Sequence, residues 1–233
     1  MSTIASPAQQ HSRTATPEVP RPVRSLAVRR AFLVAAPVLA GLFLIVGAVA
    51  DPASGIAGQR MHEIYTANPE ALQFKSLGYK WAYAFWILPS LMAVPYVRRK
   101  GAAIATLAGF VGFGGLSTMP GLLSSDWFES AVGQLYGVDA IEKVFGHMED
   151  TMWGVPVFLM PGIIGLAFGL PLIMAALWRA GFARWWGFAA SVAAFAVFMV
   201  SEATVWGATA SAVILTVVAV ALAKATKAAD VEV

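Results

Sequence analysis

Hydrophobic residues along this chain gather in six blocks, each about as long as one crossing of a lipid bilayer. The blocks are 31–50, 81–97, 102–123, 152–178, 185–200 and 203–223. Because roughly 20 apolar residues in a helix span the hydrocarbon core, each block predicts one transmembrane helix, some of them tilted. We therefore predict an all-α integral membrane protein with six transmembrane helices in three hairpins.

The polar segments outside these blocks divide the chain. Residues 1–30 are rich in Ser, Thr, Pro and Arg and lack apolar periodicity, which predicts a disordered cytoplasmic tail. Residues 31–223 form the six-span transmembrane domain, and residues 224–233 form a second cytoplasmic tail. The Arg29-Arg30 pair and the small residues before Asp51 also resemble an export signal, but five further spans favour a first block that stays uncleaved.

Two longer loops, 51–80 and 124–151, carry helical patterns of their own. In the second, apolar residues recur at helical spacing in two sets, one around Phe128 and one around Phe145. In the first, Asn68 before a proline favours a helix from Pro69 to about Leu77. We predict that these loops form short amphipathic helices at the membrane interface.

Charged residues give the orientation. With the N-terminus inside, twelve of the sixteen Lys and Arg residues fall on the cytoplasmic side, and ten of the thirteen acids fall outside. Such an excess of cations marks the cytoplasmic face. We expect a multi-pass protein of the cell membrane with both termini in the cytoplasm and an acidic outer mouth.

Composition excludes several kinds of chemistry. Of the 233 residues, 58% are hydrophobic and 12% are charged, which fits a chain surrounded by lipid. The absence of cysteine removes disulfides, thiol nucleophiles and Cys-ligated metals. The basic residues act as a topology signal, so nucleic acid is not an expected partner, and nothing in the sequence indicates a cofactor.

The six blocks contain no Asp, Glu, Lys, Arg or His, which disfavours ion-coupled transport. Candidate acid–base groups therefore lie outside them. Glu202 occupies the short turn of the last hairpin, and Glu149 and Asp150 end the second outer loop. Partial burial of Glu202 would make it a usable proton donor, although it also fits a plain acid at the end of a span.

Four tryptophans are candidate ligand-binding residues. Trp81, Trp153 and Trp206 lie near the outer interface, and Trp86 lies deeper in its block. Their rings could line an apolar cavity and hold a cationic or planar ligand, whereas the simpler alternative is an interfacial aromatic belt.

Prolines and glycines mark the second to fourth blocks as an inner bundle. Pro89, Pro161 and Pro171 predict kinks, and Gly165 with Gly169 forms a close-packing motif. The pattern leaves open whether these helices enclose a cavity or simply touch. His62 and His147 would suit a metal if their loops converged, but they lack the spacing of a metal-binding helix, and no metal site is predicted.

These features lead to three functional hypotheses. The first is a protein that binds a lipid-like or apolar small molecule at an outward-facing cavity, or acts as an accessory subunit. The second is a membrane-embedded enzyme that uses the carboxylates on an isoprenoid or lipid, and the third is a transporter of a neutral solute. The expected partners are membrane lipid, a hydrophobic ligand, and a second copy or another membrane protein.

Overall fold

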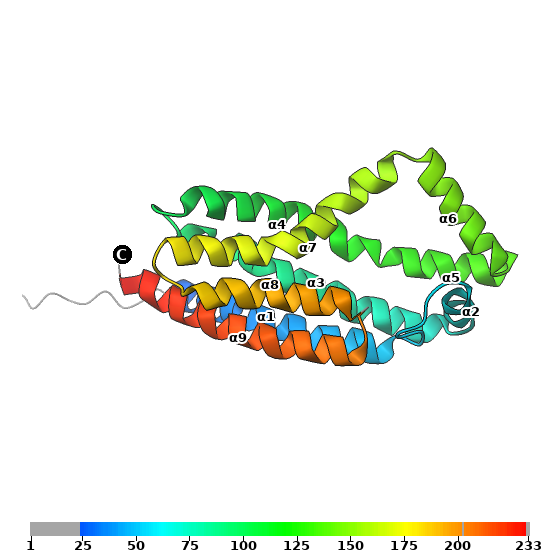
Figure 1. Ribbon diagram of the computed structural model, residues 1–233, viewed down its shortest axis with the longest axis horizontal. Helices are drawn as coiled ribbons and strands as arrows, with labels where there is room; N and C mark the ends of the chain where they lie inside the picture. Colours follow the sequence, from blue (N-terminus) through cyan, green and yellow to red (C-terminus); the bar gives the residue numbers. More distant parts are fainter. Residues whose placement is uncertain (1–23, 202, 232–233) are drawn as a thin grey trace, which may run out of the picture.

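The computed structural model describes residues 24–201 and 203–231, and these are almost wholly helical, with no strand (Figure 1). The long helices are Arg24–Ala50 (α1), Pro69–Met92 (α3), Ala102–Leu122 (α4), Gly154–Arg179 (α7), Trp185–Val200 (α8) and Val205–Val231 (α9). The short ones are Gln59–Ala67 (α2), the 3₁₀ turn Val94–Tyr96 (η1), Ser124–Tyr136 (α5) and Asp139–Thr151 (α6). The predicted all-α class is confirmed.

Four helical stretches of the described chain are long and apolar enough to cross a membrane. They are Ala27–Ala50, Ala102–Tyr136, Gly154–Arg179 and Val205–Ala229. Helix α8 is apolar but shorter, with 16 residues. The structure thus agrees with a multi-pass membrane protein, and the count of six spans stays a prediction.

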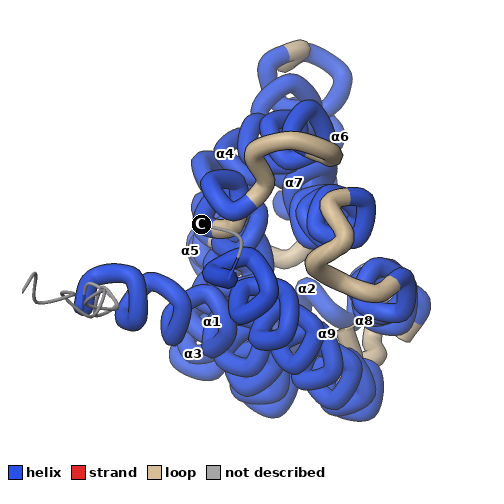
Figure 2. Tube along the Cα trace, turned by 90° about the vertical axis from the view of Figure 1, so that its left-hand side faces the viewer, coloured by secondary structure: helices blue, strands red, loops and turns tan. Residues whose placement is uncertain are grey.

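The long helices pack in neighbouring pairs. Helix α1 contacts both α3 and α9, α4 contacts α7 most extensively, and α8 contacts α9 (Figure 2). Buried side chains such as Trp86, Leu170 and Met174 fill the space between them. Both ends of the described chain lie at the same end of the bundle (Figure 1).

Glycines set the closest helix contacts. A Cβ atom on Gly115 of α4 would lie 2.6 Å from the Cα atom of Gly165 on α7, and one on Gly78 of α3 would lie 2.5 Å from the backbone nitrogen of Gly47 on α1. In lipid, small residues let helix backbones approach this closely and gain dispersion contacts. At Gly165, therefore, tight packing is the role that the structure supports.

Helix α3 is longer than the sequence suggested. The predicted start at Pro69 is confirmed, but the helix runs on to Met92, so the expected short helix and the second apolar block form one element. Gly78 lies between the two predicted elements, but it does not break the helix. It lies where α3 meets α1. Pro95 ends the regular helix because it lacks an N–H group and disfavours helical geometry at Val94.

Helices α2, α5 and α6 form the end of the molecule opposite the two ends of the described chain, and we call it the outer end (Figure 1). Helices α5 and α6 confirm the helical patterns of the second loop, and Phe128 and Phe145 make an edge-to-face contact between them at 6.4 Å. Helix α5 continues in nearly the direction of α4, and α6 folds back toward α7 (Figure 1). Helix α2 packs on α5. Their placement at a membrane interface stays a prediction.

Helix α1 begins at Arg24, seven residues before the predicted start at residue 31. The rest of the predicted N-terminal tail, residues 1–23, lies outside the described residues.

Candidate functional site

Two hollows of the described structure could hold a small molecule. The first, which we call the outer cavity, lies where the outer ends of α1, α3 and α5 meet α2, and its volume is about 340 Å³. The second, the apolar groove, lies between α4 and the first turns of α7, and its volume is about 630 Å³. The two hollows share no lining residue.

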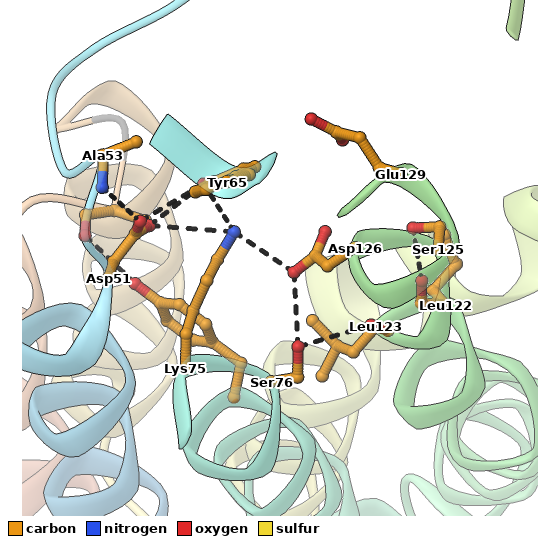
Figure 3. A network of polar contacts seen from close by, with 12 residues as sticks. Asp51, Ala53, Tyr65, Lys75, Ser76, Leu122, Leu123, Ser125, Asp126 and Glu129 are labelled. Carbon is orange, nitrogen blue, oxygen red and sulfur yellow. Dashed lines mark hydrogen bonds and ion pairs between the residues drawn. The ribbon is translucent and has the colours of Figure 1, made fainter. Parts of the chain in front are cut away.

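Lys75 is central to the polar contacts of the outer cavity. Its Nζ atom lies 3.1 Å from Oδ2 of Asp126 and 3.7 Å from Oδ2 of Asp51 (Figure 3). All three side chains are largely buried, with 11 to 18% of their surface exposed. Since an isolated charge at such a site would lose most of its hydration, the pairing stabilises each of the three.

Tyr65 links the lysine to one of the acids. The Nζ atom of Lys75 donates to the Tyr65 hydroxyl at 2.6 Å, and that hydroxyl donates to Oδ1 of Asp51 at 3.2 Å. Burial, followed by the negative charge of Asp51, raises the pKa of Tyr65 well above its usual value. The phenol therefore stays protonated and acts as a fixed donor to Asp51.

Asp126 uses only one of its carboxylate oxygens. Its Oδ2 atom accepts from the Ser76 hydroxyl at 3.4 Å and pairs with Lys75. Its Oδ1 atom has no hydrogen bond or ion pair within the described part of the chain, and Figure 3 shows no contact drawn to it. This oxygen is thus available to a further donor.

Beyond Lys75 along α3, aromatic side chains also line the outer cavity. Tyr79 and Tyr83 both line the outer cavity, and their rings stack at 5.8 Å. The Tyr79 hydroxyl donates to the backbone oxygen of Ala203 at 3.1 Å. Tyr83 is only 8% exposed, yet its hydroxyl makes no hydrogen bond with any described residue. One turn further along α3, the buried indole N–H of Trp86 also has no partner there.

A separate pair joins α2 to α5. Nδ1 of His62 lies 2.5 Å from Oε1 of Glu129, and both side chains are mostly buried. Ser130 adds to this interface by donating to the backbone oxygen of Tyr65 at 2.9 Å. These contacts hold α2 over the outer cavity.

The apolar groove has a different character. Aromatic and aliphatic side chains dominate its wall, among them Phe110, Phe113 and Phe158. Its polar side-chain groups are the hydroxyls of Ser117 and Thr118 and the indole N–H of Trp153. Both hydroxyls already donate to the backbone oxygen of Gly114. The groove therefore offers dispersion contacts and no free charge.

Two of the three candidate carboxylates, Glu149 and Asp150, line neither hollow. Glu149 and Asp150 are exposed on α6. Glu202 lies outside the described residues, although its neighbour Ala203 lines the outer cavity.

The four tryptophans are not brought together. Trp153 is 81% exposed and lines the apolar groove. Trp86 is buried and packs against Phe198, while Trp81 stacks on Phe85. Trp206 is exposed and lines neither hollow.

The two loop histidines have different surroundings. His62 pairs with Glu129, whereas His147 is exposed on α6. Across the described residues, no group of three or more His, Asp or Glu side chains is placed to hold a metal ion.

The residues of the outer cavity were missed at the level of the sequence, although a signal for them exists. Lys75, Tyr79, Tyr83 and Trp86 recur at helical spacing, which places them along one face of a continuous helix. The sequence pattern predicts one element that ends near Leu77 and another that begins at Trp81. Because these were treated as separate helices, the face that the residues share was not recognised. Comparison with known proteins gave no match to a family model, a curated protein or a solved structure.

Proposed function

We propose that this protein is a six-span protein of the cell membrane that binds a lipid-like or other apolar small molecule in the apolar groove between α4 and α7. The main observation that supports the proposal is the presence and size of this groove. Its volume of about 630 Å³ lies within the range of small-molecule sites, which is about 300 to 1,000 Å³.

The lining of the groove supports an apolar ligand. An aromatic wall attracts acyl or isoprenoid carbon through dispersion, and an exposed indole such as that of Trp153 prefers the boundary between hydrocarbon and water. A ligand could therefore lie along α4 with its polar end near Trp153.

The distribution of charge supports the proposed orientation. Cationic residues lie just after η1, at the connection between α7 and α8, and in the last turns of α9. All of these positions are at the end of the bundle where α1 begins (Figure 1). These cations are Arg98, Arg99, Lys100, Arg179, Arg184, Lys224 and Lys227. We place this end in the cytoplasm together with both termini, which leaves the outer cavity and the first turns of α7 on the external side.

Binding is favoured over carboxylate catalysis at this groove. Neither Glu149 nor Asp150 lines it, and none of the described residues that line it is ionisable. A reaction that needs a proton donor or acceptor would lack one beside a ligand held there.

The test is retention of an apolar molecule by the purified protein. We expect native mass spectrometry of the full chain in mild detergent to show about one lipid-sized adduct. We expect Ser117→Trp to reduce that adduct at least about fivefold, because the indole fills the groove.

A matched control adds the same bulk elsewhere on the exposed apolar surface. Val213 on α9 is 63% exposed and lies outside both hollows, so Val213→Trp should retain the adduct. A wild-type protein without any adduct, or equal retention in Ser117→Trp and the wild type, would overturn the proposal.

A further inference from the structure

We propose that the outer cavity is a second binding site, separate from the apolar groove, and that its ligand is a small organic cation with an ammonium group. The proposal rests on the charge of the cavity, its aromatic wall and one largely buried tyrosine whose hydroxyl has no partner among the described residues. None of these depends on what the groove binds.

Among the described residues, the charges that line the cavity do not cancel. Asp51 and Asp126 carry two formal negative charges against the single positive charge of Lys75. The 3.7 Å separation between Lys75 and Asp51 is long for an ion pair, and Oδ1 of Asp126 has no partner in the described structure. A largely buried site with one excess negative charge favours a cationic ligand.

The aromatic wall fits an organic cation better than a hydrated metal ion. Tyr65, Tyr79 and Tyr83 line the cavity, and the ammonium of Lys75 already lies 4.2 Å from the centre of the Tyr65 ring. Faces of aromatic rings attract ammonium groups through their quadrupoles. The fixed ammonium of Lys75 would repel a divalent ion, and the described residues that line the cavity include two carboxylates, fewer than a calcium site uses.

The Tyr83 hydroxyl points to a ligand independently of the charges. More than nine-tenths of this residue is buried, it lines the cavity, and its hydroxyl has no hydrogen-bond partner among the described residues. Because this hydroxyl opens onto the cavity, a polar group bound there would form a hydrogen bond with it. A ligand with an ammonium and a hydroxyl group, within a volume of about 340 Å³, satisfies Asp126 and Tyr83 together.

The test uses choline and a neutral molecule of the same shape. We expect isothermal titration of the purified full chain to show choline binding, and 3,3-dimethyl-1-butanol, which lacks the charge, to bind at least about tenfold more weakly. Methylammonium distinguishes a general ammonium site from one that requires the quaternary group. Tighter binding of either cation than of the alcohol supports the proposal.

Two variants locate the site, each with a control. Asp126→Asn and Tyr83→Phe should each weaken choline binding about tenfold: the first removes the negative charge that attracts the quaternary ammonium, and the second removes the hydrogen-bond partner of the choline hydroxyl. Glu142→Gln and Tyr136→Phe make the same chemical changes at exposed positions of the outer end and should leave binding unchanged. Tyr83→Phe removes a hydroxyl that bonds to no described residue, so it should fold even if Asp126→Asn does not.

The proposal is overturned if neither choline nor methylammonium binds, or if the neutral alcohol binds as tightly as choline. Unchanged choline affinity in Tyr83→Phe would equally exclude the outer cavity as the site. Each of these results leaves the adduct test of the apolar groove unaffected, since the two hollows have no lining residue in common.

Discussion

Lys75 connects residues that are far apart in the sequence. Asp51 follows α1, Tyr65 belongs to α2, and Asp126 lies in the first turn of α5, yet all three contact the same ammonium group (Figure 3). Each contact joins α3 to a different segment of the outer end. The lysine thus contributes to the fold as well as to the charge of the outer cavity.

We expect Lys75→Met to destabilise the protein by about 3 kcal/mol, because it leaves two largely buried carboxylates without their cation. The free energy of unfolding in mixed micelles, measured by titration with sodium dodecyl sulfate, checks this. Lys80→Met, which removes an exposed lysine from the same helix, should change it by less than about 0.5 kcal/mol. Equal effects of the two substitutions would contradict this role of Lys75.

Single residues of the site were predictable only in part. The sequence placed Asp51, Lys75 and Asp126 on the outer side, because each lies between apolar blocks. It could not show that they meet, since their contacts span 24 and 51 positions of the chain and depend on how α3 and α5 continue past the apolar blocks. Glu202 stays a prediction because it lies outside the described residues.

Among the elements, α4 and α7 make the tightest pair and also border the apolar groove. Gly115 and Gly165 bring the two backbones together, while Gly114 and Pro161 line the groove beside that contact. The sequence left close packing and a cavity as alternatives, and the structure places the two features side by side. Close contact on one face of α4 leaves room next to it because the helices diverge toward α6 (Figure 1).

We expect Gly115→Ala to destabilise the protein by about 1 to 3 kcal/mol, since its Cβ atom would lie 2.6 Å from the backbone of α7 and the helices would have to separate. The same micelle titration measures the effect. Gly146→Ala provides the control: this helical glycine of α6 has open space around it, so the change should be neutral or stabilising. A neutral Gly115→Ala would show that the α4–α7 contact is looser than described.

Helix boundaries were predicted best where a helix coincides with one apolar block. Helix α8 has the predicted range, α4 starts where predicted and ends one residue earlier, and α7 starts two residues later and ends one residue later than predicted. The prediction failed at α3, where an apolar stretch continues into a polar one within a single helix. Apolar length identifies where a helix can lie in hydrocarbon, but it does not indicate where that helix ends in water.

At the scale of the whole molecule, the chain has two chemically different ends. One end carries the clustered cations and both ends of the described chain, and the other carries the outer cavity with its acids. An asymmetry of this kind orients multi-pass proteins during insertion. The sequence predicted this division from the order of its blocks and the charges between them, because successive helices that cross the bundle must reverse direction.

The most direct test of this account is the accessibility of single cysteines, which the chain permits because it has none of its own. Cysteines replacing the exposed residues Glu70 and Glu142 should react with a membrane-impermeant maleimide in intact spheroplasts. Cysteines replacing Lys100 and Lys227, exposed at the opposite end, should react only after the membrane is permeabilised. Labelling of all four positions without permeabilisation, or of Lys100 and Lys227 from opposite sides, would contradict a membrane bundle with both termini in the cytoplasm.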